Sequence, residues 1–335
     1  MTTERQQRIF MTGATGYIGS RVTEFALRDG FVVHGLSRSA SGAAKLRALG
    51  AVPVSGDLAS LDVLRSEAAQ ADIVMHLADA WIDDFSQPYD DVVRIDGAAV
   101  DAMVGGLAAR SGSDEKKKLF LGTSGIGVVA PDARDGETDE GAPEDPNPMN
   151  GRIRCERHVL GKAAAAEAAG GDIRVCVVRL PPFVYGRGGS GVRLFMDVYA
   201  KLGFVPRVGD GRVQTTVVHV DDAARAYVLA ARRACAEPGE VAGVVYNVSS
   251  STEVTFRDLT DAIAATMGLP VREMEAAEAA ETAGPLIAGF FTSRIRGRSD
   301  KIRRELGWVP TEIDIVADIR DGSYVQAAKA LRDQA

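Results

Sequence analysis

The chain has 335 residues, of which 46% are hydrophobic, so it is longer than one average domain and can bury a sizeable core. Its net charge of −7 argues against nucleic acid and anionic membranes as partners, because both attract clustered basic residues. Three widely spaced cysteines predict neither a disulfide framework nor a metal site, and a polar N-terminus without an apolar run of about 18 residues predicts a cytoplasmic protein with no signal peptide or membrane span.

The first predicted element is a strand that leads through a glycine-rich turn into a helix, in the sequence IFMTGATGYIG at 9–19. A pyrophosphate must come within hydrogen-bonding distance of backbone N–H groups, and any Cβ would stand in the way. Gly13 makes the turn, Gly16 admits the phosphates and Gly19 lets the helix pack on the sheet. The same glycines could form a plain surface turn, but the flanking strand and helix favour a dinucleotide site. The other predicted cofactor contacts in this stretch are Thr15, Tyr17 and Ile18.

The second apolar run, at 32–36, ends in Ser37, Arg38 and Ser39, and this tip bears on the choice of cofactor. In such a fold an acidic residue at the tip accepts both ribose hydroxyls of NAD, whereas a cationic, hydroxyl-bearing tip suits the 2′-phosphate of NADP. Because Arg38 has no acidic neighbour at Ser37 or Ser39, charge complementarity favours NADP over NAD. The alternative is an arginine in a solvated loop.

Further apolar runs alternate with helical patterns. These predicted strands lie at 51–54, 73–77, 119–121 and 174–179. A helical pattern at 152–169 separates the last two. Alternating strands and helices predict an α/β fold with a doubly wound parallel sheet, whose ligand site lies at the carboxyl ends of the strands.

The residues that follow two of these strands suit such a site. Asp57 and Leu58 follow the third strand, and Asp57 can accept a hydrogen bond from an adenine amino group. An aspartate that caps the next helix would look the same. Ala78 and Asp79 follow the fourth strand, where small residues let the backbone lie against a cofactor.

The alternation of apolar runs and helical patterns becomes irregular past Gly186. Strands are predicted at 217–220 and 244–248, and an amphipathic helix at 255–267 with Thr255 as its cap.

Taken in order, the motifs resemble one family. They are TGATGYIG, GDL at 56–58, HLA at 76–78, TSG at 123–125, RLPPFVYG, VVHVDDAARA, YNVSS and KIRRELGWVP. Over nearly the whole chain they resemble the extended short-chain dehydrogenase/reductase family, also called the NAD-dependent epimerase/dehydratase family. The resemblance implies a small-molecule substrate and a homodimer formed through the helices near 101–109 and 152–169.

The resemblance also implies a domain division and a set of cofactor contacts. A Rossmann domain that binds NAD(P) spans 1–183, and 217–250 returns to it; a smaller α/β substrate lobe comprises 184–216 and 251–335. The residues that the resemblance places beside the cofactor are Leu77, Ala78, Thr123, Pro181, Phe183 and Val184.

The chain departs from the family at its catalytic Tyr-x-x-x-Lys pair, whose positions fall on Pro148 and Arg152. No tyrosine lies between Tyr89 and Tyr185, so no other register supplies the usual proton donor. Arg152 can keep the electrostatic role of the lysine, and Ser124 is the nearest hydroxyl for orienting a carbonyl. Tyr185 is the candidate substitute acid, although a tyrosine at this position is more often a packing residue.

Phe183 stands where nucleotide-sugar members of the family carry an asparagine, so it replaces a polar contact with an apolar wall. We therefore predict an NADP-dependent oxidoreductase that reduces a carbonyl of a small, largely apolar substrate, aromatic or polyketide-like, without the usual tyrosine. One alternative is non-redox isomerisation, cyclisation or elimination on the same fold. Another is a cofactor-sensing protein without turnover.

Overall fold

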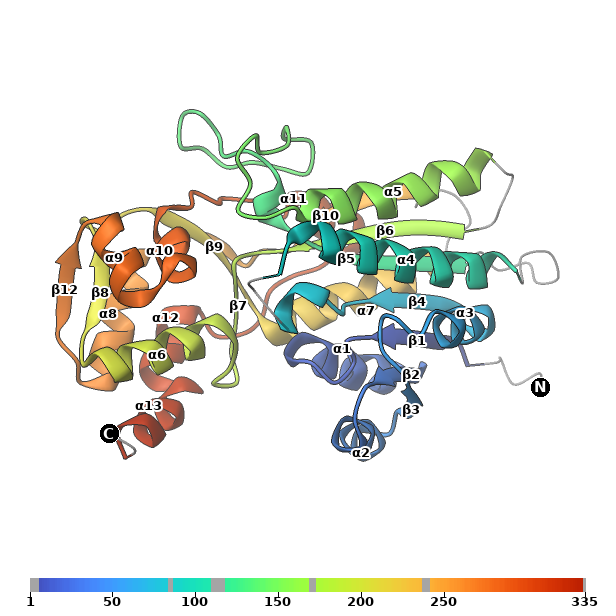
Figure 1. Cartoon of the computed structure of the whole chain (residues 1–335), viewed down its shortest axis with the longest axis horizontal. Coiled ribbons are helices and arrows are strands. Elements are labelled where there is room, and N and C mark those ends of the chain that lie inside the picture. The colour runs from blue at the N-terminus through green and yellow to red at the C-terminus, as the bar shows by residue number, and fades with distance from the viewer. Residues whose placement is uncertain (1–5, 84–86, 110–117, 169–172, 237–241, 334–335) are drawn as a thin grey trace.

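The computed structural model describes residues 6–83, 87–109, 118–168, 173–236 and 242–333. Its centre is a seven-stranded sheet in the order β10-β6-β5-β4-β1-β2-β3, with every neighbouring pair parallel (Figure 1). The strands are β1 (Arg8–Thr12), β2 (Val32–Ser37), β3 (Val52–Ser55), β4 (Ile73–His76), β5 (Lys118–Gly125), β6 (Ile173–Leu180) and β10 (Ala242–Asn247). The predicted doubly wound α/β fold is confirmed.

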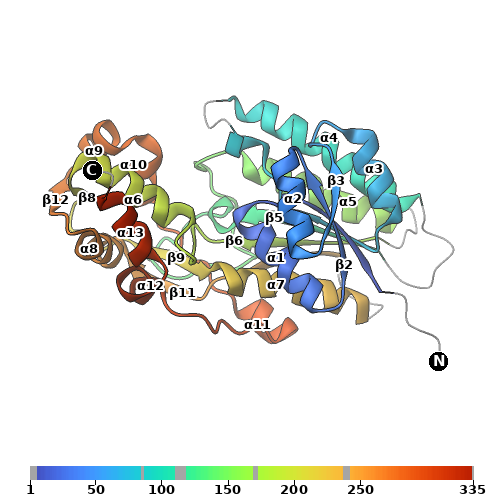
Figure 2. The same ribbon diagram turned by 90° about the horizontal axis from the view of Figure 1, so that it is seen from below.

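Two helical layers cover this sheet because its buried strands carry apolar side chains on both faces. Met11 and Met75 belong to the cluster that includes α1 (Tyr17–Arg28) and α7 (Val220–Ala236). Phe10 and Val74, one position earlier on the same strands, belong to the cluster on the opposite face. The helices of that face are α3 (Leu61–Gln70), α4 (Tyr89–Ala108) and α5 (Arg152–Ala168). Helix α2 (Ala40–Leu49) packs beside β2 and β3 at the sheet edge (Figure 2).

Most of the remaining elements form a second body beside the carboxyl ends of the central strands (Figure 1). One small sheet holds β11 (Ser251–Thr255), β9 (Gln214–His219) and β7 (Phe183–Tyr185), and another pairs β12 (Val271–Met274) with β8 (Val205–Val208). The helices are α6 (Ser190–Leu202), α8 (Phe256–Met267), α9 (Ala276–Ala283), α10 (Pro285–Thr292), α12 (Ile315–Asp321) and α13 (Tyr324–Arg332). The predicted cap of α8 is present, since Thr255 and Asp258 form a reciprocal capping box.

The segment 217–250 divides its contacts between the two bodies. Helix α7 packs on α1, and β10 extends the central sheet next to β6. Strand β9 instead pairs with β7 and β11 in the second body. The domain boundaries drawn from the sequence therefore stay a prediction. Short helices α11 (Asp300–Leu306), η1 (Ala80–Asp83) and η2 (Ile126–Val128) complete the assigned elements. No helix in the described residues combines the length and apolar character needed to cross a membrane.

Candidate functional site

A cavity of about 690 Å³ lies at the carboxyl ends of the central strands. The predicted cofactor contacts that line it are Gly13, Thr15, Gly16, Tyr17, Ile18, Gly19, Arg38, Asp57, Leu58, Leu77, Ala78, Asp79 and Thr123. The remaining lining residues are Leu36, Ala59, Ala80, Gln87, Ile95 and Ser190. The fold thus gathers residues from the ends of five strands into one site at the place where this fold binds ligands.

The glycine turn has the shape of a phosphate cradle. Gly13 has φ 71°, and a Cβ built on it would lie 2.7 Å from the backbone nitrogen of Ala78. A Cβ on Gly19 would lie 2.1 Å from the carbonyl oxygen of Gly13, so α1 can approach the turn only without a side chain there. Gly16 is the N-cap of α1 and provides no capping side chain. The N–H groups of the first turn are therefore available to an anion.

Arg38 lines the cavity beyond the end of β2. The pKa of the Asp57 carboxyl lies below its usual value, chiefly because Ser60 donates a hydrogen bond to it, and the charge of Arg38 adds to this lowering. Asp57 accepts hydrogen bonds from the backbone of Ala59 at 3.0 Å and from the Ser60 hydroxyl at 2.8 Å. It thus orders the turn before α3, whose N-cap is Ser60, and it also lines the cavity, so its contact with adenine stays a prediction. Lys45, which sequence reasoning missed because no motif marks it, donates to the carbonyl of Thr15 at 2.8 Å.

Ser37 and Ser39 are not among the residues that line the cavity, and their role as cofactor contacts stays a prediction. Ser39 caps α2 by accepting a hydrogen bond from the backbone of Gly42 at 3.1 Å. The Ser37 hydroxyl donates to the carbonyl of Ser39 at 3.0 Å. Both hydroxyls are therefore used to build the turn that presents Arg38.

Four residues predicted at the site from the β6–β7 segment are also not among the residues that line the cavity. Pro181 and Val184 are buried in the protein. Phe183 is 2% exposed and packs edge-on against Phe195, at 5.6 Å between ring centres. Tyr185 is 1% exposed and donates a hydrogen bond to the carbonyl of Ile313 at 2.7 Å.

Their roles at the site stay predictions, and strand pairing explains where their side chains lie. Because β7 pairs with β9, Phe183 and Tyr185 turn into the aromatic core of the second body. For Tyr185 the structure shows the packing alternative rather than a substitute acid.

Arg152 is the first residue of α5 and forms an ion pair with Asp79, which lines the cavity. Burial alone would lower the pKa of Arg152, but the charges of Asp79 and Asp96 raise it above its usual value. The guanidinium is therefore a permanent positive charge that one carboxylate ties to the cavity wall. Arg152 itself does not line the cavity.

Ser124 is the next-to-last residue of strand β5 and, like Arg152, is not among the residues that line the cavity. A Cβ on the adjacent Gly125 would lie 3.8 Å from Cδ of Arg152. Ser124 is 4% exposed, and its hydroxyl has no hydrogen-bond partner within the part of the chain that the structure describes. The neighbouring Thr123 lines the cavity and shares a hydrogen bond of 2.8 Å with the Tyr227 hydroxyl, which fixes its rotamer.

A series of hydrogen bonds links Thr12, His76 and Asp96. The Thr12 hydroxyl is 2.7 Å from Nδ1 of His76, and Nε2 of His76 is 3.0 Å from the Asp96 carboxylate. Although burial opposes it, the His76 hydrogen bond holds the pKa of Asp96 below its usual value. Burial raises the pKa of the Cys155 thiol to about 12, so this thiol stays protonated and is no nucleophile at neutral pH. No motif or residue spacing in the sequence indicated this series of hydrogen bonds.

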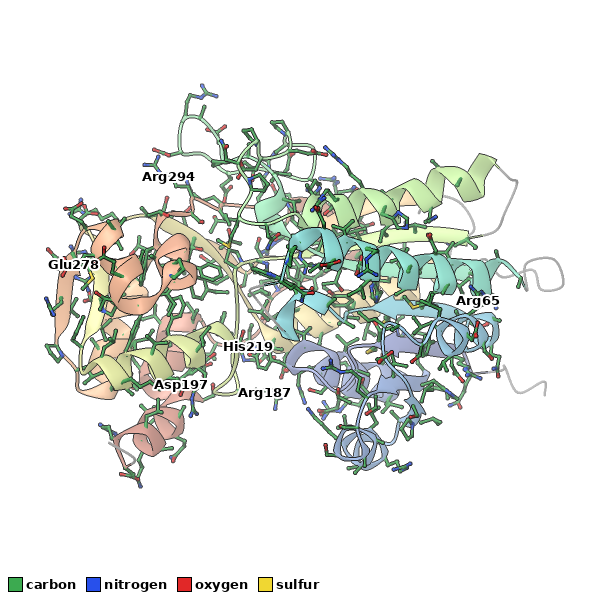
Figure 3. All side chains as sticks on the ribbon, viewed as in Figure 1. Arg65, Arg187, Asp197, His219, Glu278 and Arg294 are labelled. Atoms are coloured by element: carbon green, nitrogen blue, oxygen red, sulfur yellow. The ribbon has the colours of Figure 1, made fainter. Side chains whose placement is uncertain are left out.

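The loop after β7 closes over the glycine turn. The Tyr17 hydroxyl donates to the carbonyl of Gly186 at 2.8 Å, and the Tyr324 hydroxyl donates to the carbonyl of Gly189 at 2.8 Å. Arg187 on this loop lies near His219 at the junction of the two bodies (Figure 3). It donates to Asp221 at 2.6 Å, so the loop is also held by an ion pair.

His219, Asp221 and Glu312 bring ligand-type atoms within 4.8 Å of one another. Arg21 donates to Asp221 at 2.7 Å, and Arg187 pairs with the same carboxylate. Two guanidinium groups therefore already neutralise the negative charge of Asp221 that would attract a metal cation.

Comparison with known proteins gives a consistent result. Residues 9–249 match the NAD dependent epimerase/dehydratase family. An uncharacterized protein of Schizosaccharomyces pombe is 30% identical over 318 residues, which cover 95% of this chain and 99% of that protein. The 4-hydroxy-2-methyl-3-oxo-4-farnesyl-3,4-dihydroquinoline-1-oxide ketoreductase of Stigmatella aurantiaca is 26% identical, over 90% of this chain and 91% of that protein. The structure of the dTDP-glucose 4,6-dehydratase DesIV of Streptomyces venezuelae, with NAD and TYD bound, has the same fold, with a TM-score of 0.73 and 20% identity over 98% of both chains.

Proposed function

The chain belongs to the NAD dependent epimerase/dehydratase family and is an NAD(P)-dependent enzyme of oxidoreductase type, and we propose that it uses NADP to reduce the carbonyl group of a small, largely apolar substrate. The observation that carries the proposal is the single cavity that joins the glycine cradle to Arg38 at one end and to Asp79 and Thr123 at the other. Its volume of about 690 Å³ falls within the range of pockets that hold cofactor-sized ligands.

The preference for NADP over NAD rests on charge. Arg38 is exposed on the cavity wall, and the residues on either side of it are serines rather than acids. A guanidinium can donate two parallel hydrogen bonds to a phosphate, which the ribose hydroxyl of NAD cannot match. Lys45 adds a second cation near the same part of the glycine turn.

The substrate class rests on the aromatic cluster of the second body and on the ketoreductase relative. Phe290 is partly buried and packs against Phe183 at 5.9 Å between ring centres, at the edge of that cluster. The Stigmatella aurantiaca relative is named for reducing a ketone on an apolar, ring-containing compound. A substrate of this kind would replace water against the aromatic edge.

The chain provides the groups that carbonyl reduction needs around the cofactor. When bound, the reduced nicotinamide supplies the hydride. Arg152, tied by Asp79, would stabilise negative charge that develops on the substrate oxygen. Ser124 has a buried hydroxyl ready to orient that oxygen, and Tyr227 holds Thr123 in place at the cavity wall.

Turnover with defined carbonyl compounds tests the proposal. We expect the protein to consume NADPH with benzaldehyde, acetophenone or ethyl acetoacetate, more efficiently than it consumes NADH, and to form the matching alcohol. Tight NADPH binding without consumption of NADPH in the presence of any carbonyl would instead support the non-redox alternative.

A further inference from the structure

Tyr89 carries a buried hydroxyl that no described part of the fold uses. It is the first residue of α4, and its hydroxyl has no hydrogen-bond partner among the described residues. Its ring is held on two sides: the ring centre of Trp81 lies 5.8 Å away, and a Cβ on Gly151 would come within 2.6 Å of Cδ1 of Tyr89. A buried donor without a partner destabilises a folded protein, so its presence calls for an explanation outside stability.

The surroundings of this hydroxyl are those of an acid–base site. The charges that act most on its pKa are Arg152 and then Asp79, and Asp79 lines the cavity three residues beyond the end of β4. Gln87, two residues before Tyr89, also lines the cavity. The phenol therefore lies next to the start of α5, where the charge of Arg152 acts on it, and close in the chain to the lining residue Gln87.

The other six tyrosines do not share these properties. The hydroxyls of Tyr17, Tyr185, Tyr227, Tyr246 and Tyr324 are engaged in hydrogen bonds within the chain. The Tyr199 hydroxyl has no partner among the described residues, but it lies in the aromatic core of the second body. Tyr89 is thus the tyrosine that combines an unused hydroxyl with a neighbouring guanidinium.

Resting on the carbonyl reduction proposed above, we propose that Tyr89 is the proton donor of this enzyme, supplied from the start of α4 and assisted by Arg152 from α5. The carbonyl carbon of the substrate gains the hydride, and the π electrons of the C=O bond move to its oxygen. That oxygen takes the proton of the Tyr89 hydroxyl, and water returns a proton to the tyrosinate. The carbonyl is reduced by two electrons while the dinucleotide is oxidised by two.

Ser124 and Arg152 complete this arrangement. The Ser124 hydroxyl, which also has no partner among the described residues, can donate to the same substrate oxygen. Burial raises the pKa of Tyr89 above its usual value although the charge of Arg152 lowers it, so the phenol is protonated throughout the neutral range. The proton is therefore available for reduction, whereas the reverse oxidation of an alcohol requires alkaline pH to remove it.

The test compares Tyr89→Phe with Tyr199→Phe, because each removes one buried hydroxyl without a described partner and keeps the ring. For Tyr89→Phe we expect the Tm of the protein without cofactor to be unchanged or higher, since no hydrogen bond is lost. The Kd for NADPH, measured by quenching of tryptophan fluorescence, should stay within about twofold of wild type. The kcat for benzaldehyde reduction should fall by about 10²-fold to 10⁴-fold. Tyr199→Phe should keep its kcat within about twofold.

Two results would overturn the assignment. One is a Tyr89→Phe kcat within about threefold of wild type across the neutral range, which would exclude Tyr89 as the acid while the reductase function stands. The other is a large loss of NADPH affinity in Tyr89→Phe, which would make the hydroxyl a cofactor contact. Failure of the wild-type protein to reduce any carbonyl would refute the proposed function itself and would be recognised before any variant is made.

Discussion

Replacing Arg38 with alanine should weaken NADPH binding far more than NADH binding. Arg38 is exposed on the cavity wall at the end of β2, where its charge partly offsets that of Asp57. Removing it takes away the donor proposed for the 2′-phosphate and leaves the Asp57 carboxylate to repel that phosphate. Neither change touches the glycine cradle, which both dinucleotides would share.

The expected magnitude follows from the exposure of Arg38. A hydrogen bond to a charged group contributes about 1.5–3 kcal/mol, and an exposed guanidinium belongs at the lower end of that range. Loss of about 1.5–2.5 kcal/mol raises the Kd for NADPH roughly 10-fold to 70-fold. The Kd for NADH should change by less than about threefold, and the gap should narrow at high salt because exposed charges are screened.

Titration of each cofactor into wild type, Arg38→Ala and Arg28→Ala provides the assay. Arg28 is an exposed arginine on α1 that pairs with Glu24, so its removal makes the same change in net charge away from the cavity. Arg28→Ala should leave both Kd values near wild type. Equal losses for NADPH and NADH in Arg38→Ala would refute the assignment of Arg38 to the 2′-phosphate.

Three further predictions follow from the contacts. Gly19→Ala should abolish dinucleotide binding and lower the free energy of unfolding by at least about 1–3 kcal/mol, because its Cβ would lie 2.1 Å from a backbone oxygen. The control is Gly105→Ala in α4, whose Cβ would meet nothing within 4 Å. In urea unfolding this variant should be more stable than wild type by up to about 1 kcal/mol. Although burial opposes it, two arginines hold the pKa of Asp221 at about 2 against 3.8 in an unfolded chain, so its contribution of roughly 2 kcal/mol is present above about pH 4 and lost as the pH falls to about 2. The stability difference between wild type and Asp221→Asn should therefore shrink over that pH range, and a constant difference would contradict the ion pair. Tyr185→Phe should lower stability by about 1–2 kcal/mol through its lost bond to Ile313 with kcat unchanged, and a large fall in kcat would restore Tyr185 to the mechanism.

The central sheet could be predicted from the sequence because its determinants are local. Each buried strand is a short apolar run, and each run ends where a helical pattern begins. The glycine turn could be predicted equally well, since Gly13, Gly16 and Gly19 are needed at fixed positions for steric reasons. The capping box at Thr255 is another local signal that the structure confirms.

The surroundings of several other candidate site residues depend on tertiary pairing and could not be predicted from the sequence. Phe183 and Tyr185 are two positions apart on a three-residue strand, and only its pairing with β9 decides which way they point. Ser37 and Ser39 flank Arg38 in the sequence, and their hydroxyls close the backbone turn.

The cluster around Arg152 shows the limit of motif reasoning most clearly. Asp79 follows β4, Tyr89 begins α4 and Arg152 begins α5, so the three meet only because their elements end at the same edge of the sheet. A search for a tyrosine at a fixed spacing from Arg152 examines one helix and misses a hydroxyl that another helix supplies.

The transfer of deuterium from NADPH labelled on the nicotinamide C4 tests the central claim most directly. A single turnover with benzaldehyde, followed by mass spectrometry of the product, should give benzyl alcohol with one deuterium on the carbinol carbon and one equivalent of NADP. Recovery of unreduced benzaldehyde with the label still in bound NADPH would contradict the reductase account.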